Sequence, residues 1–283
     1  MTELMGPSEK QRSGFFANFD VSVVVALLLA AGFVITFATV GPWEAVRNFA
    51  VEAVILGATF WVARQYLPWE DAPRERIKKP LFELIAGLAG YALLVYGAIR
   101  LYNGQSAWAL LTAGMLIPVA VLLAHRYSAA AWGLRLPRGR DWAVLVIVAL
   151  LVILISFVAG KLLPQGEIAA PASEALKNFT IGGSLLAAFV LAAILEELFF
   201  RVYLQPRLAA FVSGRWALFW QAVLFSAAYF PLYSIANGYS LPYSVALTLA
   251  LTNGVLAGYF WRKTGSLPLL ILLHLVAFSR FGL

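Results

Sequence analysis

Residues 142–160 read WAVLVIVALLVILISFVAG, an apolar run without a charged side chain. A helix needs about 20 such residues to cross the hydrocarbon core of a bilayer. Because lipid offers no hydrogen bonds, a backbone inside it must satisfy its own polar groups, and a run this long favours a helix over a barrel strand. The stretch therefore predicts a transmembrane helix.

The same pattern runs through the rest of the chain. Of its 283 residues, 62% are hydrophobic and 12% are charged, whereas a soluble domain is about half apolar and about a quarter charged. Apolar windows predict nine candidate spans, of which the second is weak and the last is short. They cover residues 20–40, 48–63, 81–101, 107–125, 142–160, 181–199, 216–234, 243–261 and 266–280. The sequence therefore predicts an all-α, polytopic transmembrane helical bundle with eight to nine spans.

The basic residues gather in alternate loops between these spans. The net charge is +7, and cytoplasmic loops of membrane proteins carry an excess of Lys and Arg. The basic loops lie at residues 64–79, 126–140, 201–215 and 262–263. We therefore expect an integral, multi-pass protein of a prokaryotic plasma membrane, with its N-terminus in the cytoplasm. The lipid bilayer accounts for the charge, and we predict no nucleic-acid partner.

Two carboxylates and an arginine end one apolar run, in ILEELFFRVYLQPRL at residues 194–208. An ionisable residue within a span is costly and by default indicates a functional site. Glu197 and Arg201 are four residues apart, so they share a helix face and are predicted to pair. Glu196 points about 100° away, and a carboxylate beside apolar walls is suited to general base catalysis. The alternative is that both glutamates lie at the headgroup level and only decorate a helix end.

Two histidines complete the ionisable candidates. His274 lies in LLILLHLVAF, within the last predicted span. It either faces the same interior as Glu196 or bonds to another helix as a neutral ring. His125 is next to Arg126 at the end of the fourth span, where we expect an interfacial side chain. The chain has no cysteine, which excludes disulfides and cysteine-ligated metal sites.

The order of these motifs resembles the CPBP family of intramembrane endopeptidases, which includes the prenyl-protein (CAAX) type II proteases. The resemblance covers residues 184–277, from EELFFRVYLQPRL through LFSAAYFP and TGSL to a span with a single histidine. It implies that Glu196 activates water and that Glu197 and Arg201 form a supporting pair. It also implies that His274 is the histidine of the last motif, in a site inside the membrane that opens to the cytosol.

The chain departs from the family pattern at two positions. The family's FxxxH reads FSAAY here, so Tyr229 replaces the histidine, and HxxxN reads HLVAF, so Phe278 replaces the asparagine. Tyr229 is a hydrogen-bond donor of a kind that stabilises an oxyanion. A divalent metal would be left with the two glutamates and His274, a poor set compared with three protein ligands plus water. The metal and the cofactor therefore stay unknown.

Two functions stay open after these departures. The first is an endopeptidase that cleaves membrane-proximal peptide bonds of a membrane-anchored protein or peptide by glutamate-activated water. The second is a catalytically degenerate member of the family that binds or scaffolds a membrane partner, so enzymatic activity is left open. A transporter is disfavoured because no paired repeat is evident. We divide the chain into N-terminal transmembrane helices, residues 1–180, and a CPBP-like core with the motifs, residues 181–283.

Overall fold

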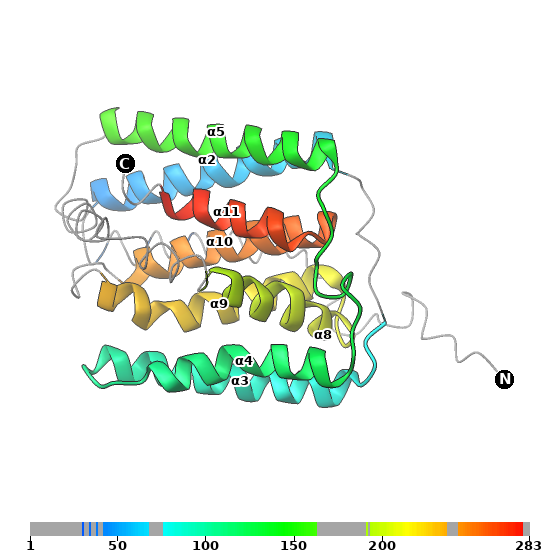
Figure 1. Cartoon of the computed structure of the whole chain (residues 1–283). Coiled ribbons are helices and arrows are strands. Elements are labelled where there is room, and N and C mark those ends of the chain that lie inside the picture. Colours follow the sequence, from blue (N-terminus) through cyan, green and yellow to red (C-terminus); the bar gives the residue numbers. More distant parts are fainter. Residues whose placement is uncertain are drawn as a thin grey trace.

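Every regular element that the structure describes is helical. The computed structural model describes residues 42–67, 76–162, 193–236 and 243–279, together with Ala30, Val34, Ala38 and Leu191. In chain order the elements are α2 (Pro42–Tyr66), α3 (Pro80–Tyr102), α4 (Trp108–Ala124), α5 (Gly139–Leu162), the π-helix η3 (Leu198–Leu204), α8 (Gln205–Ala209), α9 (Gly214–Ala236), α10 (Tyr243–Thr264) and α11 (Leu267–Ser279). The axes of the long helices are roughly parallel. The helices are stacked from α5 on one side to the pair α3 and α4 on the other, with α10 and α11 between them (Figure 1). The all-α prediction is confirmed for this part of the chain.

Helices from the two predicted parts of the chain pack against one another. Helix α10 lies against α9, while α3 packs against α9 and α2 packs against α5 and α10. The interior between α3, η3 and α9 is aromatic, and the rings of Phe200 and Phe225 meet edge to face at 5.1 Å. The division of the chain at residue 180 stays a prediction, because residues 163–190 lie outside the described ranges.

The outer surface of α5 is apolar. Val146, Leu150 and Leu154 follow one another at four-residue spacing and are 53%, 61% and 57% exposed. Large exposed apolar patches mark interaction or membrane surfaces, and this stripe agrees with the lipid-facing helix predicted over residues 142–160. By length and composition, one described helix, Pro80–Leu101, qualifies as a membrane span. The count of eight to nine spans stays a prediction, and most of the candidates at residues 20–40 and 181–199 lies outside the described residues.

The helical chain does not end at residue 199, where the predicted sixth span ends. Residues 193–197 are α-helical, and the chain continues as η3 and α8 to Ala209 without a loop. Arg201 and Arg207, which the pattern of basic loops placed in the cytoplasm, are only 1% and 3% exposed. Each lies inside because a buried glutamate pairs with it. The two arginines are therefore internal counter-ions of buried acids, and the cytoplasmic placement of this segment stays a prediction.

The segment TNGVLAGYF, residues 252–260 of α10, carries glycines at four-residue spacing, a pattern that lets helices pack closely. A Cβ atom built on Gly254 would lie 2.9 Å from the Cα atom of Ala222 on α9, and one built on Gly258 would lie 2.7 Å from the Gln221 Oε1 atom. Both distances are too short for a side chain. The two glycines therefore let α10 approach α9 closely, and α9 follows directly on the segment with the glutamates.

The contact between α3 and α4 also depends on glycine, which yields a stability prediction. A Cβ atom on Gly90 would lie 2.8 Å from the Gly114 carbonyl oxygen, so Gly90→Ala must push the two backbones apart. We expect the free energy of unfolding to fall by about 1–3 kcal/mol, the usual cost of overpacking. Gly57→Ala on α2 is the control, because a Cβ atom there meets nothing within 4 Å. Denaturation in detergent micelles checks this, and equal stability of the two variants would contradict it.

Candidate active site

The two glutamates of EELFFR lie at the point where an α-helix becomes a π-helix. Glu196 and Glu197 occupy the last α-helical positions before η3, and Arg201 lies within η3. Glu196 is 7% exposed and Glu197 is fully buried, so both are enclosed by the protein rather than decorating an exposed helix end. π-Helical turns are rare and occur frequently at functional sites.

One imidazole ring connects both glutamates. His274 of α11 has its Nδ1 atom 2.7 Å from Glu197 Oε1 and its Nε2 atom 3.4 Å from Glu196 Oε2. The ring is itself buried, at 7% exposed. Each ring nitrogen donates only when it carries a proton, so the ring meets both carboxylates as a donor only as an imidazolium. The ring therefore joins the three groups into one buried polar cluster.

Glu197 also pairs with the guanidinium of Arg201. Arg201 Nε lies 3.3 Å from Glu197 Oε2, with both side chains buried, so the pair predicted from the four-residue spacing is confirmed. The Arg201 guanidinium also lies over the Phe225 ring, 4.1 Å from its centroid, in the geometry of a cation–π contact. Glu197 is thus fixed between the Arg201 guanidinium and Nδ1 of His274. Glu196 lies at the other ring nitrogen, Nε2.

A small cavity opens beside this cluster. Its volume is about 30 Å³, which is enough for one or two water molecules. Its polar wall is formed by Glu197, Arg201, Asn253 and His274, and its other walls are mostly aliphatic, from Ile55, Val148, Leu256 and Leu273 among others. Five helices and η3 contribute to these walls, so the cavity exists only when both parts of the chain are packed together. Glu197 rather than Glu196 lines this cavity.

The structure brings together four of the five predicted site residues. The fifth, Tyr229, lies in α9, and Phe278 lies in α11, but both side chains lie outside the described residues. Convergence of the Tyr229 phenol on this site therefore stays a prediction. Within the described ranges, no three His, Cys, Asp or Glu side chains are arranged to hold a metal ion. The reason in this cluster is geometric, because the two nitrogens of His274 face different carboxylates.

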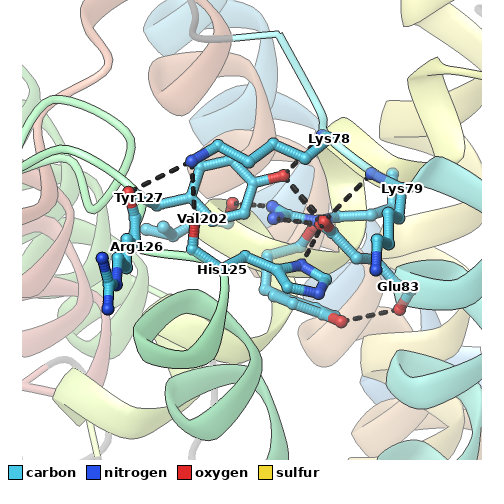
Figure 2. A network of polar contacts seen from close by, with 9 residues as sticks. Lys78, Lys79, Glu83, His125, Arg126, Tyr127 and Val202 are labelled. Carbon is cyan, nitrogen blue, oxygen red and sulfur yellow. Dashed lines mark hydrogen bonds and ion pairs between the residues drawn. The ribbon is translucent and has the colours of Figure 1, made fainter.

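A buried carboxylate outside this site was not predicted from the sequence. Glu83, near the start of α3, is fully buried, and dashed contacts converge on its carboxylate in Figure 2. Arg207 Nη2 lies 2.7 Å from Glu83 Oε2. His125 ends α4 as expected, but its ring turns inward, with Nδ1 2.7 Å from Glu83 Oε1. His125 thus contacts a buried carboxylate, and its placement at the membrane interface stays a prediction. The signal that would have found this network is a glutamate inside the predicted span 81–101.

Tyr127 closes this second network from the loop after α4. Its hydroxyl donates to Glu83 Oε1 at 2.8 Å and accepts from the backbone N–H of Lys78 at 2.8 Å. Burial is the main cause that raises the pKa of the Tyr127 phenol, so the ring keeps its proton at neutral pH. The buried carboxylate therefore receives donors from the residue before α3, from the end of α4 and the loop after it, and from α8.

Comparison with known proteins supports the resemblance drawn from the motifs. Residues 178–277 match the model of the Rce1-like family of type II CAAX prenyl endopeptidases. The matched range contains EELFFR, helices α9 and α10 and His274. No curated protein and no solved structure matches the chain. Members of this family are embedded in the membrane, which supports the prediction of an integral membrane protein. The match of residues 178–277 to an Rce1-like type II CAAX prenyl endopeptidase domain is consistent with membership of the CPBP family.

Proposed function

We propose that this protein is an intramembrane endopeptidase in which Glu196 activates a water molecule. The observation that carries the proposal is a buried pair of glutamates bridged by the two nitrogens of His274. A base needs a proton acceptor within reach of water and a neighbour that takes up or returns the proton. Glu196 and His274 supply both, next to a cavity large enough for water.

The proposed reaction divides the work among four side chains. Glu196 takes a proton from water while the hydroxide adds to the carbonyl carbon of the scissile bond. The negative charge that develops on the carbonyl oxygen is stabilised by donors of the site, among which we include His274 and the Tyr229 phenol. The proton then passes to the leaving amine as the C–N bond breaks. Glu197, held by Arg201, keeps the His274 ring in place.

The proposed substrate is a lipid-anchored peptide. The matched family is described as prenyl endopeptidases, and the apolar walls of the cavity suit an aliphatic neighbour of the cleaved bond. A substrate held in the bilayer by its lipid arrives at the bundle already concentrated in two dimensions. We propose that cleavage occurs at the membrane-proximal end of such a tail, on the cytosolic side.

A second function is favoured by one specific observation. The family's motif histidine and asparagine are replaced here by Tyr229 and Phe278, which removes an imidazole and an amide from the expected site. Under this second proposal the bundle binds a membrane partner without cleaving it. The double variant Tyr229→His with Phe278→Asn separates the two. Cleavage that appears only in the double variant supports the binding function, whereas cleavage by the natural protein supports the endopeptidase.

The test of the proposed endopeptidase uses His274. The assay uses proteoliposomes and a prenylated peptide with a fluorophore and a quencher on opposite sides of the scissile bond. We expect His274→Ala to lower kcat by about 10²-fold or more, the range for loss of an acid–base group. Thr252→Val on α10 serves as a control for a buried polar change outside the cluster. Product formation in ¹⁸O-labelled water should place one labelled oxygen in the new carboxylate. Equal rates for the natural protein and His274→Ala would contradict the proposal.

A further inference from the structure

We propose that Glu83, on a helix outside the matched range, is a positioning residue for the glutamate–histidine site. It holds the π-helical segment that carries Arg201 and that directly follows Glu196 and Glu197. The contacts that carry this inference lie between α3 and the segment from η3 to α8. Its catalytic consequence rests on the proposed endopeptidase function, but the anchoring itself does not.

The two segments meet along matching rows of residues. On α3 the row is Glu83, Gly87 and Gly90, and on the facing segment it is Arg207, Tyr203 and Phe199. A Cβ atom on Gly87 would lie 2.9 Å from Tyr203 Cε1, and one on Gly90 would lie 3.2 Å from Phe199 Cε2. The glycines thus admit the two rings, and Glu83 meets Arg207 at the end of the row. This complementarity specifies one register between α3 and η3.

The Arg207 guanidinium donates hydrogen bonds both to the Glu83 carboxylate and to the backbone of the π-helix. Its Nε and Nη2 atoms donate to Glu83 Oε2 at 2.9 and 2.7 Å. Its Nη1 atom donates to the carbonyl oxygens of Val202 and Tyr203 at 3.3 and 3.2 Å. These carbonyls belong to η3, so the same side chain that binds Glu83 also caps the end of the π-helical turn. The Tyr203 hydroxyl adds a bond of 2.6 Å to the Glu83 backbone carbonyl.

Glu83 is in turn fixed from the other side. Tyr127 donates to both carboxylate oxygens, at 2.8 and 3.0 Å, and His125 Nδ1 lies 2.7 Å from Oε1. The backbone N–H of Lys79 reaches Oε1 at 3.3 Å. Figure 2 shows these donors around one carboxylate. A fully buried acid with partners from three segments is a rigid support rather than a solvated surface charge.

The register of η3 decides where the site residues point. An α-helix turns about 100° per residue, and a π-helical turn contains one more residue than the i→i+4 pattern allows. If η3 relaxed to α-helix, the residues before it would rotate by about 100° relative to Arg207. Glu196 and Glu197 would then turn away from His274 while Arg207 stayed at α3. Glu83 therefore acts on the site through Arg207, without touching water or substrate.

The kinetic test compares Glu83→Gln with a matched buried acid. We expect Glu83→Gln to lower kcat by about 10–100-fold with KM changed less than about 2-fold, because the cavity walls remain while the glutamates lose their alignment. Arg207→Lys should give the same pattern, since lysine keeps the charge but lacks the fork of donors. Asp141→Asn is the control, because Asp141 is 5% exposed and accepts from the backbone of Arg138 without contacting η3. This variant should keep the natural kcat.

A second measurement does not depend on activity. Hydrogen exchange of the amides of residues 198–207, followed by mass spectrometry in detergent, should be at least about 10-fold faster in Glu83→Gln and Arg207→Lys than in the natural protein and in Asp141→Asn. Unchanged exchange together with an unchanged kcat overturns the proposal, and Arg207→Lys decides the matter if Glu83→Gln does not fold. If the natural protein cleaves no prenylated peptide, faster exchange still supports the anchoring by Glu83, and only the endopeptidase function falls.

Discussion

Glu196→Gln is expected to abolish cleavage of a prenylated peptide, with a loss in kcat of about 10²–10⁴-fold, the range for removal of a general base. Glutamine has nearly the same shape, so it keeps the packing of a side chain that is 7% exposed. It has no site for the proton that water gives up, and its amide replaces the oxygen that lies 3.4 Å from His274 Nε2. The measurement is kcat in proteoliposomes at saturating peptide.

Glu197→Gln is the comparison that assigns the base. Glu197 is bound to both Arg201 and His274, so we expect this variant to lose stability as well as activity. If Glu196 is the base and Glu197 the support, Glu196→Gln should unfold at the same midpoint as the natural protein. Glu197→Gln should unfold at a lower midpoint. The assignment is reversed if Glu196→Gln retains cleavage and a stable Glu197→Gln does not, a result in line with the place of Glu197 in the cavity wall.

Arg201→Met is expected to lower the free energy of unfolding by about 3–5 kcal/mol, the usual cost of leaving one partner of a buried ion pair uncompensated. The substitution keeps an unbranched side chain in the core, so little volume is lost. It leaves the Glu197 carboxylate with His274 alone and removes the cation from the face of Phe225. Chemical denaturation in micelles, read by tryptophan fluorescence, measures the change.

The double variant Arg201→Met with Glu197→Gln separates charge from packing. Replacing both members of a buried pair is often nearly neutral for stability, so we expect the double variant to recover at least half of the loss. An equally large loss in single and double variants would show that Arg201 acts by its volume and not by its charge. Neither variant is expected to cleave peptide, because the double variant loses the Glu197 carboxylate beside His274 and the single variant loses the guanidinium that holds this carboxylate.

Features that depend on near neighbours in the chain were predictable. Apolar windows located α3, α4 and α5 closely, since burial of a long apolar helix is decided within each run. The pairing of Glu197 with Arg201 followed from helix geometry alone. The meeting of His274 with the glutamates was an expectation from the motifs and not from spacing, because α11 packs next to them only through the tertiary fold.

Features that depend on distant partners were not predictable. Glu83 and Arg207 are 124 positions apart, and no local pattern connects them. Arg207 was grouped with the loops because a basic residue after an apolar run is the ordinary mark of the cytoplasmic side. The π-helix escaped notice for a related reason, since LFFRVYL contains no glycine or proline that signals an irregular turn. Its geometry is held by contacts with α3, where Tyr203 and Arg207 both bond to Glu83.

The row of small residues on α3 has a consequence for protein engineering. Gly87 and Gly90 leave room for Tyr203 and Phe199, so the C-terminal half is shaped to one particular helix far upstream. A chimaera that joins this half to the upstream helices of a relative needs both glycines and an acid at matching heights. Without the glycines, the Tyr203 and Phe199 rings would clash with the upstream helix. Without the acid, the Arg207 guanidinium would be buried without a counter-ion.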